Sequence, residues 1–172
     1  SLNWTGGVAS GASGDPQRGG AIHISGSSST FLTEGSVFSK NTAQYAGGGI
    51  YSLNGPTITL INTTLNLNVG QYGGAIAAYT NTQLIATSCV FEKNKVSKGG
   101  GALFCYNNAN CKIRFSTLLE NEVDPGDSGY GGGAIDAESA PTVIVQESTL
   151  SNNIAPVAQG DEFFTRGDPV FH

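Results

Sequence analysis

The sequence predicts an all-β fold: a single-stranded right-handed parallel β-helix, or β-solenoid, of about five to six coils with three short strands per coil. Two tetrapeptide motifs lead to this prediction, and each occurs five times. The first motif is a glycine pair followed by a small and an apolar residue, at 19–22, 47–50, 73–76, 100–103 and 132–135. The second motif is Phe or Leu, two spacer residues and Asn, at 38–41, 65–68, 91–94, 118–121 and 150–153.

The two motifs keep the same spacing along the chain. Their apolar residues follow one another after 28, 26, 27 and 32 residues in the first series and after 27, 26, 27 and 32 in the second. A period of this length is typical of a solenoid, in which each unit buries its apolar face only by stacking on its neighbours.

A third stretch with strand character lies between the two motifs of each repeat. It contains alternating β-branched or apolar residues, at 30–33, 57–61, 83–86, 112–115 and 142–145. Each coil is therefore expected to hold three short strands. A helix is excluded because no window keeps a 3.6-residue apolar period, and each glycine would cost about 1 kcal/mol inside one. The handedness rule for parallel crossovers favours a right-handed coil.

Residues one period apart are expected to stack in columns along the coil. One inward column contains Ile22, Ile50, Ile76, Leu103 and Ile135, and another contains Phe38, Leu65, Phe91, Leu118 and Leu150. The second motif adds a column of Asn41, Asn68, Asn94, Asn121 and Asn153. Asn tolerates the left-handed backbone of a tight corner, and its amide can bond to the same amide one coil away. A structural asparagine ladder is therefore expected at this corner.

The length fits one β-helix domain over residues 1–172. Residues 1–18 are expected to form an N-terminal cap or partial coil, 19–153 the five repeats, and 154–172 a partial last coil and tail. Phe163 falls where the sixth apolar residue of the first motif is expected. Because the chain starts at Ser1 and contains no Met, we expect it to be a piece of a longer protein.

The composition excludes several classes of function. A net charge of −5 and a pI near 4.8 argue against a nucleic-acid partner, which needs a basic stripe. No run of eighteen apolar residues is present, so membrane insertion by this segment is not expected. Lys93, Lys95 and Lys98 form the only basic cluster, and a solvated rim is the favoured interpretation.

The paired Gly-Gly-Ala-Ile and Phe-x-x-Asn repeats resemble those of the polymorphic outer membrane proteins of chlamydiae, and of the wider group of extracellular right-handed parallel β-helix (pectin-lyase-like) proteins. The resemblance covers about residues 19–153. It implies a non-enzymatic extracellular or cell-surface module, a structural spacer or adhesin-like element. The partners that it implies are glycans, other surface proteins or neighbouring modules of the same protein.

A candidate binding strip lies at the outward positions beside the first inward column. These positions hold His23, Tyr51, Ala77, Phe104 and Asp136. We expect an exposed apolar and aromatic strip that docks a carbohydrate or another protein. The alternative interpretation is a set of ordinary exposed aromatic residues on a β surface.

The competing function is a carbohydrate-active enzyme, either a polysaccharide lyase or a glycoside hydrolase on a β-helix scaffold. Such enzymes need two carboxylates, or a carboxylate with Lys or Arg, converging on one outer face. The outward row contains a single acid, Asp136, so no catalytic residue is assigned. His23 is interpreted as a surface residue and not as a base.

No cofactor is expected, and calcium is the one metal considered. Glu122, Asp124 and Asp127 lie close together in the longest repeat, but they lack the ordered Asp-x-Asp spacing of calcium loops, so a solvated loop is favoured.

The remaining candidate sites are covalent. Cys105 and Cys111 face each other across a turn and could form a disulfide, and the alternative is that they and Cys89 are three buried thiols. Asn3 and Asn62 begin glycosylation sequons, which would make the chain a glycoprotein in a eukaryotic secretory pathway.

Overall fold

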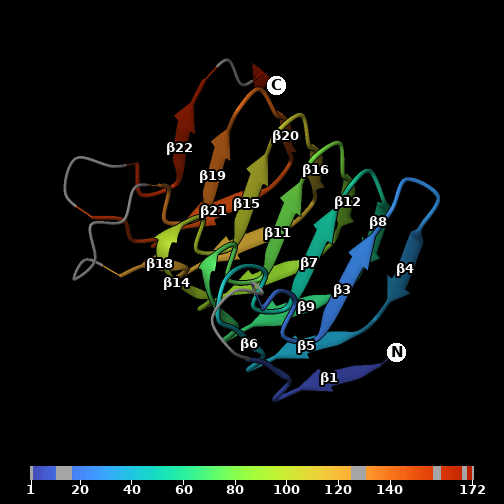
Figure 1. Ribbon diagram of the computed structural model, residues 1–172. Coiled ribbons are helices and arrows are strands. Elements are labelled where there is room, and N and C mark those ends of the chain that lie inside the picture. Colours follow the sequence, from blue (N-terminus) through green and yellow to red (C-terminus); the bar gives the residue numbers. More distant parts are fainter. Residues whose placement is uncertain (1, 11–16, 125–130, 157–159, 168–169, 172) are drawn as a thin grey trace.

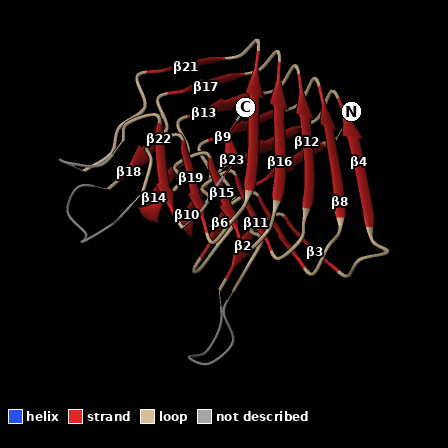
Figure 2. Cartoon of the chain, turned by 90° about the horizontal axis from the view of Figure 1, so that it is seen from above, coloured by secondary structure: helices blue, strands red, loops and turns tan. Residues whose placement is uncertain are grey.

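The computed structural model describes residues 2–10, 17–124, 131–156, 160–167 and 170–171 (Figure 1). All regular elements in these ranges are β-strands. The strands form four parallel sheets that wind around one core, and we name them sheets A to D in chain order. Figure 2 shows the four sheets surrounding that core.

Each sheet collects one strand from each successive coil. Sheet A contains β1 (Asn3–Thr5), β5 (Val37–Ser39), β9 (Thr64–Asn66), β13 (Val90–Glu92), β17 (Thr117–Leu119) and β21 (Thr149–Ser151). Sheet B contains β2 (Val8–Ala9), β6 (Thr42–Ala43), β10 (Val69–Tyr72), β14 (Lys95–Gly99) and β18 (Glu122–Val123). Sheet C contains β3 (Ile22–Ser25), β7 (Ile50–Leu53), β11 (Ile76–Tyr79), β15 (Leu103–Tyr106), β19 (Ile135–Glu138) and β22 (Phe163–Arg166). Sheet D contains β4 (Thr30–Glu34), β8 (Thr57–Ile61), β12 (Gln83–Thr87), β16 (Asn110–Arg114), β20 (Thr142–Gln146) and β23 (Val170–Phe171).

The predicted register between coils is confirmed. Ile76 of β11 pairs with Ile50 on one side and Leu103 on the other, and the same one-period offset holds in sheets A and D. At the C-terminal end, Phe163 pairs with Ile135. Sheets C, D and A hold the three strands that the sequence predicts for each coil. The short strands of sheet B follow the Asn corner as a fourth segment.

The interior is filled by columns of like side chains. Ile50, Ile76 and Leu103 are fully buried in one column, and Phe38, Leu65, Phe91 and Leu118 are fully buried in another. At the N-terminal end Trp4 extends the second column, because it pairs in register with Phe38 and stacks on its ring at 6.1 Å. Parallel strands buried on the inner face with like residues above and below explain the stability of such a coil without a second layer.

The corners need special backbone conformations. In every repeat the residue before the ladder Asn is left-handed, with φ between 53° and 57°, although it is never glycine: Lys40, Leu67, Lys93, Glu120 and Asn152. The glycine pair has two causes: its first residue is left-handed in the first four repeats, with φ between 56° and 68°, and its second residue lies close to the next coil. A Cβ on Gly74 would collide with the carbonyl oxygen of Gly101 on the next coil.

Candidate functional site

The asparagine column forms a continuous hydrogen-bonded ladder inside the corner between sheets A and B. The Nδ2 of Asn68 donates to Oδ1 of Asn94 at 2.9 Å, and the backbone N–H of Asn68 donates to the same oxygen at 3.1 Å. The other steps repeat this pattern, from Asn41 to Asn68, from Asn94 to Asn121, and from Asn121 to Asn153. At the end, Asn153 Nδ2 donates to Oε2 of Glu162 at 2.6 Å. The five amides are buried and used within the coil, so their role is structural.

The prediction that the outward row of sheet C is exposed to solvent is wrong. Tyr51, Phe104 and Asp136 are only 1 %, 2 % and 0 % exposed, and Ala77 is fully buried. His23 alone is exposed, at the edge of the row, where it meets the Tyr51 ring edge-on at 5.0 Å. These outward side chains form a second apolar cluster outside the coil, so Tyr51 and Phe104 do not present a binding surface themselves.

A layer of tyrosines covers that cluster. Tyr79 and Tyr106 occupy the outward positions two residues after Ala77 of β11 and Phe104 of β15. Tyr45 and Tyr72, from the region of sheet B, pack against the same cluster. The rings pack closely, with centroid distances of 4.8 Å for Tyr72–Phe104 and 5.3 Å for Tyr79–Tyr106. Burial raises the pKa of Tyr51, Tyr72 and Tyr79, so these hydroxyls stay protonated at neutral pH.

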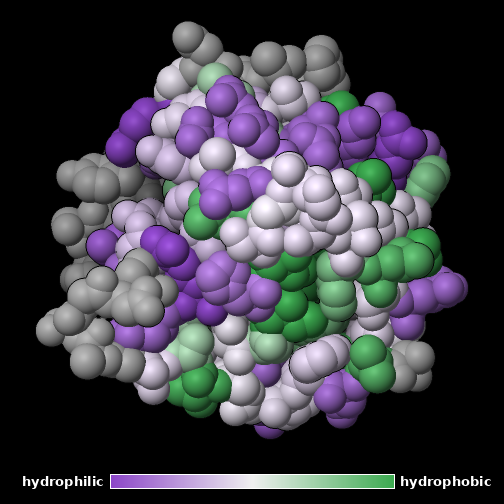
Figure 3. All heavy atoms as spheres, turned by 45° about the vertical axis from the view of Figure 1, so that its right-hand side comes forward, coloured by the Kyte–Doolittle hydropathy of each residue, from purple (hydrophilic) through white to green (hydrophobic). Residues whose placement is uncertain are grey.

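We call this partly exposed layer, formed by Tyr45, Tyr72, Tyr79 and Tyr106, the aromatic face. Five of the six tyrosines of the chain belong to it or lie beneath it. The clustering of tyrosines in repeats two to four was a signal in the sequence that could have indicated such a face. The outward row of sheet C does not by itself reveal which side chains from other parts of the chain cover it. In the view of Figure 3, near-neutral and apolar residues gather across the middle of the visible side, with hydrophilic residues around them.

Three cations border the aromatic face, each over a ring. The Arg18 guanidinium lies 5.1 Å from the Tyr51 ring centre and 5.5 Å from that of Tyr45. Lys98 Nζ lies 5.5 Å from the Tyr72 ring, and Arg166 lies 5.6 Å from the Phe164 ring. Cation–π contacts of this kind hold the side chains in place and are each worth about 0.5–1 kcal/mol at exposed sites.

Asp136 is a buried acid beneath this layer. It pairs in register with Phe104 on one side and Phe164 on the other, and Gly131 lies directly against its Oδ2. Neither carboxylate oxygen makes a hydrogen bond of good geometry. Burial above all, and then the charge of Glu138, raises the pKa of Asp136 to about 8, although Arg166 and the Ala137 N–H lower it. The carboxyl is therefore neutral at pH 7, and because it is fully buried it cannot contact a substrate.

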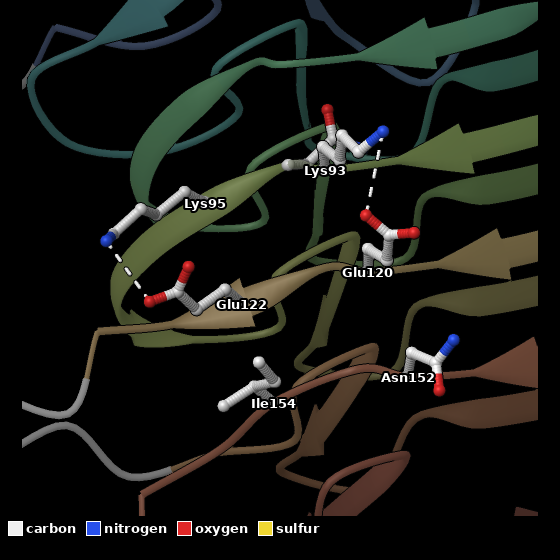
Figure 4. Close-up of a pocket in the computed structure, with 7 residues that line it drawn as sticks. Lys93, Lys95, Glu120, Glu122, Asn152 and Ile154 are labelled. Carbon is white, nitrogen blue, oxygen red and sulfur yellow. Dashed lines mark hydrogen bonds and ion pairs between the residues drawn. The ribbon is translucent and has the colours of Figure 1, made fainter.

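A charged groove of about 570 Å³ lies on the outside of the Asn corner. Figure 4 shows the ammonium groups of Lys93 and Lys95 directed at carboxylates of the next coil, Glu120 and Glu122. Lys93 lies 2.8 Å from Glu92 and 3.6 Å from Glu120. A solvated rim describes these lysines only in part, because the 27-residue offset from Lys93 to Glu120 and from Lys95 to Glu122 is a signal in the sequence for ion pairs between coils.

The position of Lys95 argues against a calcium ion at Glu122 and Asp124. Its ammonium lies 3.1 Å from Glu122 and 3.3 Å from Asp124, where a cation bound by both carboxylates would have to sit. The Glu122 hydrogen bond, followed by that of Asp124, raises the pKa of Lys95, so the ammonium remains charged. Asp127 lies outside the described residues. Within the described ranges, no group of three or more His, Cys, Asp or Glu side chains is arranged to hold a metal ion.

Comparison with known proteins identifies the family. The family model described as "Right handed beta helix region" matches residues 10–155. The chain belongs to the right-handed β-helix family. A curated relative of this β-helix is the metabotropic glutamate receptor-like protein R of Dictyostelium discoideum, which is 26 % identical over 155 residues. The alignment covers 90 % of this chain but only 9 % of that protein. No solved structure matches the chain. In the described part, no helix is long and apolar enough to cross a membrane.

The three cysteines of the β-helix are buried free thiols in the structure. Cys105 and Cys111 both point into the coil and lie near each other in its core. Cys89 Sγ approaches the Thr87 carbonyl oxygen at 3.3 Å. The structure thus shows the alternative in which all three are small buried residues and not the Cys105–Cys111 disulfide.

Thiol labelling tests this arrangement. Because only the thiolate reacts, and because burial raises the pKa of Cys89 and Cys105, we expect iodoacetamide at pH 8 to label none of the cysteines in the native protein. In denaturant without reductant we expect all three to be labelled, as counted by intact mass. A denatured chain that carries a single label would contradict this prediction and show that a disulfide forms in solution.

Both predicted glycosylation sequons are at the surface. Asn3 is exposed on β1, and the Thr5 hydroxyl donates to its Oδ1 at 2.6 Å. Asn62 is exposed at the left-handed corner between β8 and β9, with φ of 48°. The equivalent corner of other coils carries Phe115 or Glu147, so this position accepts a large outward group.

Proposed function

We propose that the chain is a non-enzymatic module of an extracellular or cell-surface protein, a stiff spacer that presents the aromatic face to a glycan or protein partner. The observation that carries this proposal is the tyrosine layer. Four partly exposed rings are held by a buried layer of Ala46, Tyr51, Ala77 and Phe104 over sheet C, whose strands from β7 to β19 are paired on both sides. Such pre-ordered aromatic side chains lose little conformational entropy when they bind a partner.

Two similarities support a surface role. The Dictyostelium relative is named as receptor-like, and this chain corresponds to a small part of its length. The Gly-Gly-Ala-Ile and Phe-x-x-Asn repeats also resemble those of the chlamydial polymorphic outer membrane proteins. A repeat module inside a long surface protein fits both similarities.

In the part of the chain that the structure describes, the charged groove is the feature that most favours the enzyme alternative, because it gathers Lys93, Lys95, Glu120 and Glu122. Its chemistry argues against catalysis. Ion pairing raises the pKa of both lysines, so neither is available as a general base at neutral pH. The carboxylates that face them are held by these ion pairs, across neighbouring coils, in a groove open to water.

A combined binding and cleavage assay tests the proposal. The purified β-helix is incubated with a panel of neutral and acidic polysaccharides and with surface proteins on beads. We expect retention of at least one ligand, with no reducing ends and no unsaturated sugars released. Product release that disappears in the Glu122→Gln variant would overturn the non-enzymatic function, and absence of any retained ligand would overturn the binding role.

A further inference from the structure

The charge around the aromatic face differs in sign from that of the whole chain. The chain carries a net charge of −5, yet three of its eight basic residues, Arg18, Lys98 and Arg166, border this one face. Of these, Arg166 is paired with Glu138 at 3.8 Å. Among the described residues, no carboxylate lies within ion-pair distance of Arg18 or Lys98. Asp136, a further acid among the described residues here, is buried and neutral at pH 7. The described part of the face is therefore locally positive.

The geometry of sheet C favours side-chain contacts over backbone pairing. All its strands from β7 to β19 are hydrogen-bonded to a neighbour on each side, so a peptide cannot add a strand in the middle of the face. What the face offers is ring surfaces, tyrosine hydroxyls and two cations. Sugar rings stack on aromatic side chains through their C–H groups, and their hydroxyls accept and donate hydrogen bonds with tyrosine.

We propose that the aromatic face binds an anionic glycan, with sugar rings stacked on Tyr79 and Tyr106 and acidic groups paired with Lys98 and Arg18. This inference rests on the proposed function, because it names the ligand class of the same face. The acidic group is a carboxylate or a sulfate, and the two share the same chemistry toward an ammonium or a guanidinium. Lys98 is exposed and held over Tyr72, so its charge is available beside the rings.

Titration calorimetry tests the inference with four probes: a heparin oligosaccharide (sulfated), a hyaluronan oligosaccharide (carboxylated), dextran (neutral) and poly-glutamate (an acidic polymer without sugar rings). We expect one or both acidic oligosaccharides to bind, and dextran to bind at least tenfold more weakly. Affinity should fall as NaCl rises, because ion pairs at an exposed surface are screened by salt. Lys98→Gln and Tyr106→Ala should each weaken binding about tenfold, which corresponds to about 1.4 kcal/mol.

Lys40→Gln is the matched control, because it removes the same charge from an exposed corner next to sheet A. It should bind as the unchanged chain does. If Tyr106→Ala lowers the melting temperature, Lys98→Gln still tests the face, because Lys98 is exposed. Equal binding of dextran and the acidic oligosaccharides, equal loss in Lys98→Gln and Lys40→Gln, or binding of poly-glutamate but no glycan would overturn the inference. None of these outcomes affects the non-enzymatic proposal, which fails on product release.

Discussion

Replacing Asn94 with Ala is expected to lower the free energy of unfolding by about 3–5 kcal/mol. Asn94 Oδ1 accepts the N–H and the Nδ2 of Asn68, and its own Nδ2 donates to Leu65 O and Asn121 Oδ1, both at 2.9 Å. The substitution leaves several of these buried groups without partners, and each such group costs roughly 1–3 kcal/mol. Urea denaturation followed by circular dichroism measures the change.

Asn66→Ala is the control for this experiment. Asn66 lies two residues before Asn68, on the outward side of β9, and its Oδ1 has no hydrogen-bond partner. Its substitution should therefore change stability by less than about 1 kcal/mol. If Asn94→Ala and Asn66→Ala were equally stable, the ladder would not be a major source of stability.

Replacing Asp136 with Asn is expected to stabilise the β-helix at pH 8 and to flatten its dependence on pH. The pKa of Asp136 is about 8 in the folded chain, against an ordinary value of 3.8. Between these values the unfolded chain releases the proton and the folded chain keeps it. The contribution of Asp136 to stability is therefore full below about pH 4 and is lost as the pH rises toward 8. The upper limit of this loss is roughly 6 kcal/mol.

Urea denaturation at pH 5 and pH 8 separates Asp136 from other groups. The difference in unfolding free energy between the Asp136→Asn variant and the unchanged chain should grow by several kcal/mol from pH 5 to pH 8. Glu147→Gln serves as the control, because Glu147 is an exposed acid at the corner between β20 and β21, away from Asp136. An Asp136→Asn chain with the same pH dependence as the unchanged chain would show that Asp136 is ionised or solvated in the fold.

The sequence was sufficient to predict the coil because its repeated motifs arise from contacts between equivalent residues of neighbouring coils. Ile50 and Ile76 are alike since each packs on the other across one coil, and the same cause applies to Asn68 and Asn94. A fixed period therefore gives the register without any structure. The short strands of sheet B gave no comparable signal, because β6 and β18 contain only two residues each.

The aromatic face was not predictable in the same way. The pattern correctly placed Tyr51 and Phe104 on the outside of sheet C, but exposure depends on what lies above a side chain. Tyr72 reaches this face from sheet B, past a corner whose path the repeat does not specify. Asp136 was likewise expected at the surface, and it is buried because Gly131 and the neighbouring rings close over it.

The central claim is that residues one period apart are in direct contact through the stack of coils. Nuclear Overhauser spectroscopy on ¹⁵N-labelled protein tests it directly at the ladder. The account predicts cross-peaks between the side-chain amide protons of Asn68 and Asn94, and between those of Asn94 and Asn121. A spectrum with assigned asparagine amides and no cross-peak between any of these pairs would contradict it.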